Sequence, residues 1–520
     1  MNFTHFCKFG LGLAALTGCA QQTQKKSDTA QPKHPNIIFI VADDLGYGDL
    51  SCYGATKIQT PNVDSLARHG MRFTDVHAVA STSTPSRYSL FTGQYSWRRN
   101  DTGIAPGDAG MIIRPEQITI ADMFKAAGYT TGAIGKWHLG LGDKTGTQDW
   151  NKEITPGPRD IGFDYSYLMA ATGDRVPCVW MDNQKVANYD SSAPIYVSYK
   201  DSFPGEPLGR SHPELLTKLL PSPNHGHNQA IVNGISRIGY MKGGGKALWE
   251  DEHIADTLTA KAVDFIRNKK DTTFFLYIGT NDVHVPRYPN ADFRGKSGMG
   301  YRGDAILQFD WTVGQIMNEL KQDGLLGNTL VILTSDNGPV VDDGYQDRAV
   351  ELLGTHRPWG DMRGGKYSSY EAGTTVPFIT YWAGKIDSGV SSALFSHIDL
   401  YASLAKLVGQ KIEEGAAPDS RDNLNALLGK DKKGRDYVIE ASPWILSINN
   451  GEWHYIVPSK GPAYNKLTNT ELGNDPKDQL YNLKEDIGEK NNVADKYPEK
   501  IKELKAILEK EMASGYKLRQ

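Results

Sequence analysis

The strongest constraint on how this chain folds is an almost uninterrupted apolar run at residues 36–42, which ends directly at Asp43 and Asp44. A run without polar alternation predicts a strand that is buried on both faces, as in a parallel sheet. Similar runs recur at residues 130–134, 274–279 and 330–335. Helical patterns lie between them, at residues 61–70, 118–127, 252–269 and 306–323. This alternation predicts an α/β fold with a mainly parallel sheet.

Two polar pairs follow two of these runs: Asp43-Asp44 comes after the first run, and Asp336-Asn337 comes after the last. Sites in such sheets lie outside the carboxyl ends of the strands. Carboxylate and amide oxygens are hard ligands, which suit Ca²⁺ or Mg²⁺ rather than zinc. A single Asp in such a place is often only a turn or cap residue. Two pairs at two strand ends favour a metal site.

The composition indicates a soluble globular protein of 520 residues, long enough for one large domain and a smaller one. The net charge of −4 gives no general positive field, so nucleic acid is not expected as a partner. The chain has 4 Cys, and none of them has the spacing of a zinc site. Cys52 and Cys178 either pair in an oxidising compartment or stay as free buried thiols, and spacing does not decide between the two.

The N-terminus has the features of a targeting segment. Lys8 precedes an apolar run at residues 9–16 that is too short to span a bilayer. The sequence Leu-Thr-Gly-Cys that ends at Cys19 resembles a bacterial lipobox, which implies a signal peptide at residues 1–18 and a lipid on Cys19. The alternative is an ordinary cleaved signal with an incidental Cys. Residues 19–34 are polar and indicate a flexible tether.

This pattern predicts a lipoprotein of a bacterial envelope, attached to a membrane through Cys19. No acidic cluster follows Cys19 directly, which favours the periplasmic side over the cell surface. Which membrane and leaflet hold the lipid is not decided by the sequence.

Residues 83–93 read Ser-x-Pro-Ser-Arg-x-x-Leu-x-Thr-Gly and resemble the signature of the type I, formylglycine-dependent sulfatases. The resemblance implies that a maturation enzyme oxidises Ser83 to formylglycine and that Arg87 supports the hydrated aldehyde. A serine here implies the type of maturation enzyme that accepts Ser, as in anaerobic bacteria. The other interpretation is a Ser/Thr-rich turn before a helix, with Pro85 in its first turn.

Further motifs extend the resemblance over most of the chain. They are Gly-Lys-Trp-His-Leu-Gly at residues 135–140, a His-x-Pro at residue 284 and Arg-Gly-Gly-Lys at residues 363–366. The resemblance implies that Lys136 and Lys366 bind sulfate, that His138 deprotonates the hydrate when sulfate leaves, and that His284 protonates the leaving oxygen. Each residue alone has a plainer interpretation, as a hydrogen-bonded loop His or a solvated Lys.

The resemblance also assigns the metal ligands and the domains. It implies calcium, with magnesium as the second choice, on Asp43, Asp44, Asp336 and Asn337. It places an alkaline-phosphatase-like catalytic domain at residues 35–410, with a large mixed, mainly parallel sheet between helices. Residues 411–520 would form a small subdomain, with an antiparallel sheet and one helix. Strand-like pieces at residues 437–441, 453–457 and 479–483 and an amphipathic pattern at residues 498–512 fit this expectation. Thr375 and Ala372 depart from the family pattern, which commonly has Arg and Gly there.

The segment around Asp174 and Arg175 resembles one in bacterial (Bacteroides-type) exo-sulfatases that act on sulfated galactose or N-acetylgalactosamine. An adjacent carboxylate and guanidinium can bind neighbouring hydroxyls as acceptor and donors. The alternative is a surface salt bridge. The loop-rich region at residues 140–227 has the length of a pocket-forming segment. Further candidates for sugar contact are His225, His227, the segment 465–473, His356 and Trp359.

Together these features predict a carbohydrate sulfatase that acts on host or algal glycans, with a sulfated saccharide as its substrate. Sulfate at O6 or O4 is favoured, and O3 stays open. One alternative is a phosphonate or phosphodiester hydrolase of the same superfamily. Another is a non-catalytic glycan-binding lipoprotein. The sequence does not decide between galactose and N-acetylgalactosamine, between exo and endo action, or between oligomeric states.

Overall fold

The computed structural model describes residues 34–514. The expected signal peptide at residues 1–18, the lipid on Cys19 and nearly all of the expected tether at residues 19–34 lie outside the described residues. Among residues 34–514, no helix is both long and apolar enough to cross a membrane.

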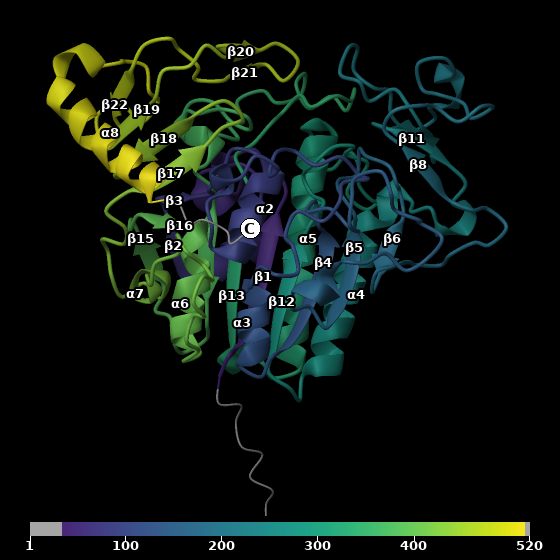
Figure 1. Cartoon of the computed structure of the whole chain (residues 1–520), viewed down its shortest axis with the longest axis horizontal. Coiled ribbons are helices and arrows are strands. Elements are labelled where there is room, and N and C mark those ends of the chain that lie inside the picture. Colours follow the sequence, from purple (N-terminus) through teal and green to yellow (C-terminus); the bar gives the residue numbers. More distant parts are fainter. Residues whose placement is uncertain (1–33, 515–520) are drawn as a thin grey trace, which may run out of the picture. The chain divides into compact units, whose positions relative to one another are not determined.

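The central sheet has ten strands and is parallel in its middle (Figure 1). β1 (Asn36–Ala42) lies between β13 (Thr329–Ser335) and β12 (Phe274–Gly279) and is parallel to both. β4 (Thr130–Lys136) and β5 (Tyr165–Met169) continue the parallel part beyond β12. β1, β12 and β13 are buried along their whole length, as their apolar sequences predict.

Shorter strands, some of them antiparallel to their neighbours, complete the sheet at both sides. They are β14 (Phe378–Tyr381), β2 (Met71–Phe73) and β15 (Gly389–Ser391) beyond β13, and β6 (Trp180–Asp182) and β7 (Lys185–Val186) beyond β5. These edge strands have two to four residues each, too few for a pattern that sequence alone reveals. β5, β6 and β7 lie in the region that the sequence predicts to be loop-rich.

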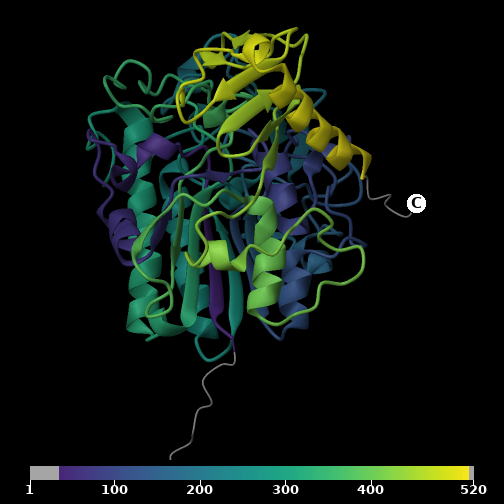
Figure 2. The ribbon, with the colours of Figure 1, turned by 90° about the vertical axis from the view of Figure 1, so that its left-hand side faces the viewer.

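Helices cover both faces of the sheet, as Figure 2 shows. One group consists of α1 (Pro61–His69), α4 (Ile254–Lys269) and α5 (Gly300–Gln322), which pack on one another. The other group consists of α2 (Ser83–Thr92), α3 (Ile120–Ala126) and α6 (Leu400–Leu407). The predicted α/β fold is therefore confirmed. α5 begins at Gly300, earlier than the apolar pattern indicates, because its first turns contain Arg302, Gly303 and Asp304.

Helix α2 brings two of the candidate residues to one face. It starts at Ser83, directly after Thr82 in extended conformation, and Pro85 lies in its first turn, where no backbone N–H is needed. Gly93 ends the helix in the left-handed conformation, with φ of 60°. Ser83 and Arg87 are four residues apart, so their side chains leave the helix on the same side.

The C-terminal part contains a second sheet of four antiparallel strands: β17 (Val438–Ala441), β18 (Leu446–Asn449), β19 (Trp453–Ile456) and β22 (Gln479–Asn482). Helix α8 (Pro498–Ala513) contributes Leu504 and Leu508 to the apolar core of this sheet. Three of these strands and the helix were predicted, whereas β18 was not. The start of a separate subdomain at residue 411 stays a prediction.

A buried cluster of charged groups connects this second sheet to the part of the chain that contains the central sheet. His454 on β19 donates to Glu489 over 2.7 Å, and His77 bonds Glu440 on β17 over 2.7 Å. Glu371 lies between them, with His454 Nδ1 3.5 Å from its carboxylate. Burial alone would lower the pKa of His454, but Glu489 and then Glu440 raise this pKa to about 9. The ring is therefore a cation at neutral pH that holds the carboxylates together.

We predict that the protein loses stability between about pH 7 and pH 9.5 through His454. A histidine whose pKa is raised on folding stabilises the fold fully below its unfolded pKa and loses this contribution as the pH passes the folded value. The contribution at pH 6 is about 2–3 kcal/mol. Thermal unfolding across this pH range should show a steeper fall for the native chain than for His454→Gln. The exposed His69→Gln variant is the control, and parallel curves for all three proteins would contradict the prediction.

Candidate functional site

The two acidic pairs meet at the carboxyl ends of β1 and β13. The parallel register pairs Ala42 with Ser335, so the residues that follow each strand lie side by side. The backbone N–H of Asp44 donates to Asp336 over 3.3 Å, and the Asn337 amide donates to the Asp44 carboxylate over 2.8 Å. The structure thus brings together all four residues that the sequence indicates as metal ligands.

Two cations and Ser83 complete the floor of the site. Lys136 Nζ lies 2.6 Å from the Asp43 carboxylate and donates to Ser83 Oγ over 2.9 Å. Arg87 donates to Asp336 over 2.7 and 2.9 Å. Ser83 Oγ also lies 3.3 Å from the Asn337 side-chain oxygen. The hydroxyl of Ser83 therefore sits between an ammonium group and the expected metal ligands.

Lys136 reaches this position because the preceding residue is a glycine. Gly135 has a φ of 92°, and a Cβ atom there would lie 1.9 Å from the carbonyl oxygen of Gly279 on β12. Only glycine allows the ends of β4 and β12 to approach so closely in this conformation. This requirement explains the first position of the Gly-Lys-Trp-His-Leu-Gly motif.

The residues present fit a hard divalent cation. The Asp43 side chain is fully buried, and apart from the Lys136 ammonium 2.6 Å from one carboxylate oxygen, its carboxylate has no hydrogen-bond partner among residues 34–514. Burial raises the pKa of Asp43 well above its usual range despite the nearby Lys136 ammonium. A buried carboxylate stays ionised only with more positive charge beside it. The oxygens of Asp43, Asp44, Asp336 and Asn337 would hold Ca²⁺ or Mg²⁺ here and supply that charge.

Lys366 joins the site from the opposite side. Its ammonium donates to the Asp44 carboxylate over 2.8 Å and to Asp343 over 2.9 Å. Burial alone would lower the pKa of Lys366, but Asp343 and Asp44 raise it well above its usual range. Lys366 is therefore a permanent cation next to the expected metal position.

Two buried histidines flank the site, each with one ring nitrogen engaged. His138 Nε2 donates to the carbonyl of Ala105 over 3.0 Å, and no described residue bonds its Nδ1. His284 Nδ1 donates to the carbonyl of Val285 over 2.7 Å, and its Nε2 lies 3.7 Å from Asp44. Burial holds both pKa values well below the usual range, helped by Lys136 at His138 and by Lys366 at His284. Both rings are thus neutral, with one nitrogen able to take a proton.

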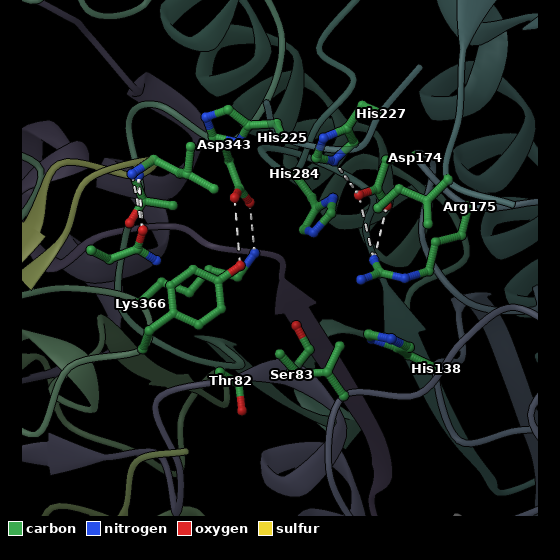
Figure 3. Close-up of a pocket in the computed structure, with 16 residues that line it drawn as sticks. Thr82, Ser83, His138, Asp174, Arg175, His225, His227, His284, Asp343 and Lys366 are labelled. Atoms are coloured by element: carbon green, nitrogen blue, oxygen red, sulfur yellow. Dashed lines mark hydrogen bonds and ion pairs between the residues drawn. The ribbon is translucent and has the colours of Figure 1, made fainter. Parts of the chain in front are cut away.

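Above this floor lies a cavity of about 220 Å³, shown in Figure 3. Ser83 and Lys366 line it at one end, and Asp174, Arg175 and His227 line it at the other, as Figure 3 shows. His138 and His284 lie between the two ends. The Asp174 carboxylate accepts from His227 Nε2 over 3.0 Å and from Arg175 over 3.1 Å. Asp174 is only 3% exposed, so the alternative of a surface salt bridge is wrong.

His227 is held in place by a loop whose role the sequence did not reveal. A Cβ atom at Gly344 would lie 2.3 Å from the His227 ring, and the Tyr345 ring packs on His227 with centroids 4.9 Å apart. The same loop carries Asp343, which lines the cavity and accepts from Lys366. Tyr367 also lines the cavity. Asp343 comes seven residues after Asp336, and Tyr367 directly follows Lys366. Proximity to a motif was the only sequence signal for these two residues.

The other candidates for sugar contact divide into two groups. His225, Asn465, Leu467 and Thr468 line the cavity, and their contact with a sugar stays a prediction. His356 does not, because its ring is buried against Asp49 at 2.8 Å. Trp359 faces a different cavity. Cys52 and Cys178 are both free thiols, which answers the question of their pairing.

Comparison with known proteins places this arrangement in context. A family model described as Sulfatase matches residues 35–410. The chain is 55% identical to an N-acetylgalactosamine-6-O-sulfatase of Bacteroides thetaiotaomicron, over 96% of this chain and 97% of that protein. It is 30% identical to human arylsulfatase A, over 92% of this chain and 88% of that protein. A structure from work on the metabolism of multiple glycosaminoglycans by Bacteroides thetaiotaomicron has a TM-score of 0.90 and 54% identity, covering 92% of this chain and 99% of that chain.

We predict that Ca²⁺ stabilises the native chain and that Asp43→Asn removes most of this effect. A ligand at a hundred times its dissociation constant adds about 2.7 kcal/mol to the free energy of unfolding. Thermal unfolding with chelator and with added Ca²⁺ measures the shift. Asp174→Asn, which changes a buried carboxylate at the far end of the cavity, is the control and should respond like the native chain. An equal response of Asp43→Asn would contradict the assignment.

Proposed function

The chain belongs to the sulfatase family and is a sulfuric ester hydrolase, and we propose that its substrate is a glycan with a terminal N-acetylgalactosamine 6-sulfate. The main support is the 55% identity to an N-acetylgalactosamine-6-O-sulfatase over almost the whole length of both proteins. The two ends of the cavity support it too. At one end Lys366 lines the cavity and Lys136 donates to Ser83, and at the other end a carboxylate, a guanidinium and an imidazole are available to a sugar.

In this proposal Ser83 is converted to formylglycine. The hydrated aldehyde supplies one hydroxyl that attacks sulfur and a second whose deprotonation releases sulfate by C–O cleavage. The contacts of Ser83 Oγ stand in for those of one of these hydroxyls. Lys136, 2.9 Å from Ser83 Oγ, is placed to stabilise negative charge there. Arg87 acts through Asp336, which it orients with two hydrogen bonds.

The two histidines carry out the two proton transfers, and Lys366 and the metal ligands bind the sulfate. The free Nδ1 of His138 accepts the proton of the second hydroxyl. His284 presents Nε2 to the leaving oxygen. In the free site its ring is neutral, and the negative charge of a bound sulfate ester favours the protonated form that donates. Lys366 binds the sulfate from the leaving-group side. The oxygens of Asp43, Asp44, Asp336 and Asn337 would hold a calcium ion, which would supply Lewis-acid stabilisation of the sulfate charge.

At the sugar end, Asp174 and Arg175 are proposed to bind neighbouring ring hydroxyls, as acceptor and donor respectively. His227 keeps the Asp174 carboxylate in place with its Nε2–H. Because Asp174 is buried, each of its hydrogen bonds has a large effect on affinity.

The cellular context is proposed from the sequence alone. We propose that Cys19 carries a lipid, that the protein faces the periplasm, and that a serine-accepting maturation enzyme modifies Ser83. The support is the Leu-Thr-Gly-Cys pattern and the Ser-x-Pro-Ser-Arg motif.

We predict selective sulfate release from N-acetylgalactosamine 6-sulfate. The assay uses Ser83→Cys protein, matured by co-expression with a formylglycine-generating enzyme, with the aldehyde verified by mass. The panel contains the 3-, 4- and 6-sulfates of N-acetylgalactosamine and galactose, and the 6-phosphate as the test for phosphoesterase activity. The 6-sulfate of N-acetylgalactosamine should be turned over at least ~100-fold faster than its 4-sulfate, since a misplaced ester loses near-attack geometry. Faster release from another regioisomer would overturn the assignment.

We predict that Asp174→Asn lowers kcat/KM for N-acetylgalactosamine 6-sulfate by about 10–100-fold, because hydrogen bonds to a charged group contribute about 1.5–3 kcal/mol each. The rate with 4-nitrophenyl sulfate, which has no sugar hydroxyls, should stay within about twofold. The exposed Asp387→Asn variant is the control for a change of charge. Equal losses on both substrates would show that Asp174 supports the fold of the site instead of binding the sugar.

A further inference from the structure

The active-site cavity is small for a glycan substrate. Its volume of about 220 Å³ lies below the range of about 300–1,000 Å³ that is usual for ligand pockets. It has room for one sulfated sugar ring beside the Ser83 end. The following units of a longer saccharide must therefore lie outside it.

A second, larger cavity lies across one hairpin from the first. The hairpin consists of β20 (Tyr464–Asn465) and β21 (Thr470–Glu471). Asn465, Leu467 and Thr468 line the active-site cavity, whereas residues 469–471 line the second one. The second cavity has a volume of about 490 Å³, and we call it the Trp359 cavity. The hairpin therefore contributes residues to both cavities, so a saccharide that extends over it would reach the Trp359 cavity.

Trp359 lies on a loop whose backbone is held by close contacts with the segment around Gly48. The backbone N–H of Gly48 donates to the carbonyl of Pro358 over 2.7 Å. A Cβ atom at Gly48 would lie 2.0 Å from the carbonyl oxygen of Arg357, so the two segments are in close backbone contact. The segment with Gly48 directly follows the metal-ligand pair at the end of β1. Trp359 is partly exposed, and its wide apolar face suits the C–H face of a sugar ring.

The charges around Trp359 favour an acidic saccharide. Arg357, Arg363 and Lys490 line the cavity together with only two carboxylates, Asp361 and Glu471. Arg363 is tied to Glu471 by hydrogen bonds of 2.6 and 2.8 Å. Arg357 pairs with Asp361, but these side chains are 56% and 80% exposed, so the pair is weak and leaves Arg357 available. Lys490 is exposed at the rim.

We propose that the Trp359 cavity binds the saccharide units that follow the sulfated sugar in an oligosaccharide carrying carboxylate or sulfate groups. This inference rests on the proposed function. In it, Trp359 stacks on a sugar ring, and Arg357 and Lys490 attract the acidic groups. Binding of these saccharide units outside the active site then adds affinity for long substrates and leaves the contacts of the reacting sugar unchanged.

The test is calorimetric binding to protein that keeps an unmodified Ser83. The probes are the monosaccharide N-acetylgalactosamine 6-sulfate and a tetrasaccharide with the same terminal sugar followed by a uronic acid. The native chain should bind the tetrasaccharide about tenfold more tightly than the monosaccharide, and Trp359→Ala should remove that difference. Lys490→Gln should reduce tetrasaccharide affinity mainly at low salt. Neither variant should change monosaccharide affinity.

The matched control is Trp444→Ala, which removes a 51% exposed tryptophan that lines neither cavity. It should keep the tetrasaccharide preference. Unchanged tetrasaccharide affinity in Trp359→Ala overturns the inference and leaves the proposed function intact if the monosaccharide binds. An equal loss for both probes also overturns it. If the native chain binds neither probe, the proposed function fails and the inference fails with it.

Discussion

The arrangement of the site depends on how the buried negative charge at the ends of β1 and β13 is compensated by cations. Three buried carboxylates, those of Asp43, Asp44 and Asp336, lie close together, and such groups repel one another strongly at short distance. Lys136, Arg87 and Lys366 each lie within 3 Å of one of them. In the proposed function, two of these cations, Lys136 and Lys366, also bind the sulfate. Stability and anion binding are therefore two results of one set of contacts.

The sequence predicted the centre of this fold well and its margins poorly. The apolar runs of β1, β12 and β13 identify buried parallel strands, and from their register the meeting of Asp43-Asp44 with Asp336-Asn337 follows. The motifs also indicated Ser83, Lys136, His138, His284 and Lys366, all of which the structure brings to one place. The short strands at the sheet edges were missed because their pairing depends on distant partners.

Only some of the residues at the sugar end of the cavity could be predicted from the sequence. Asp174 and Arg175 were indicated by the resemblance of their segment to one in bacterial exo-sulfatases. Asp343 and Tyr367 come from loops that no periodic pattern describes, and Gly344 serves His227 only through a contact between residues far apart in sequence. His356 was indicated by its position between two motifs, but its ring fills a buried contact with Asp49. Position in the chain does not reveal which way a loop residue faces.

The burial of Ser83 has a consequence for the order of events in the life of the chain. Ser83 is 3% exposed on a helix that is buried on almost every side. The residues just before this helix are fixed by the second sheet, since Ser81 and Val79 exchange backbone hydrogen bonds with Ala441. In the proposed function, an enzyme that modifies Ser83 needs this segment unfolded, so it must act before Ala441 pairs with Val79 and Ser81. The modification therefore has to precede the completion of the fold, and not only the approach of a substrate.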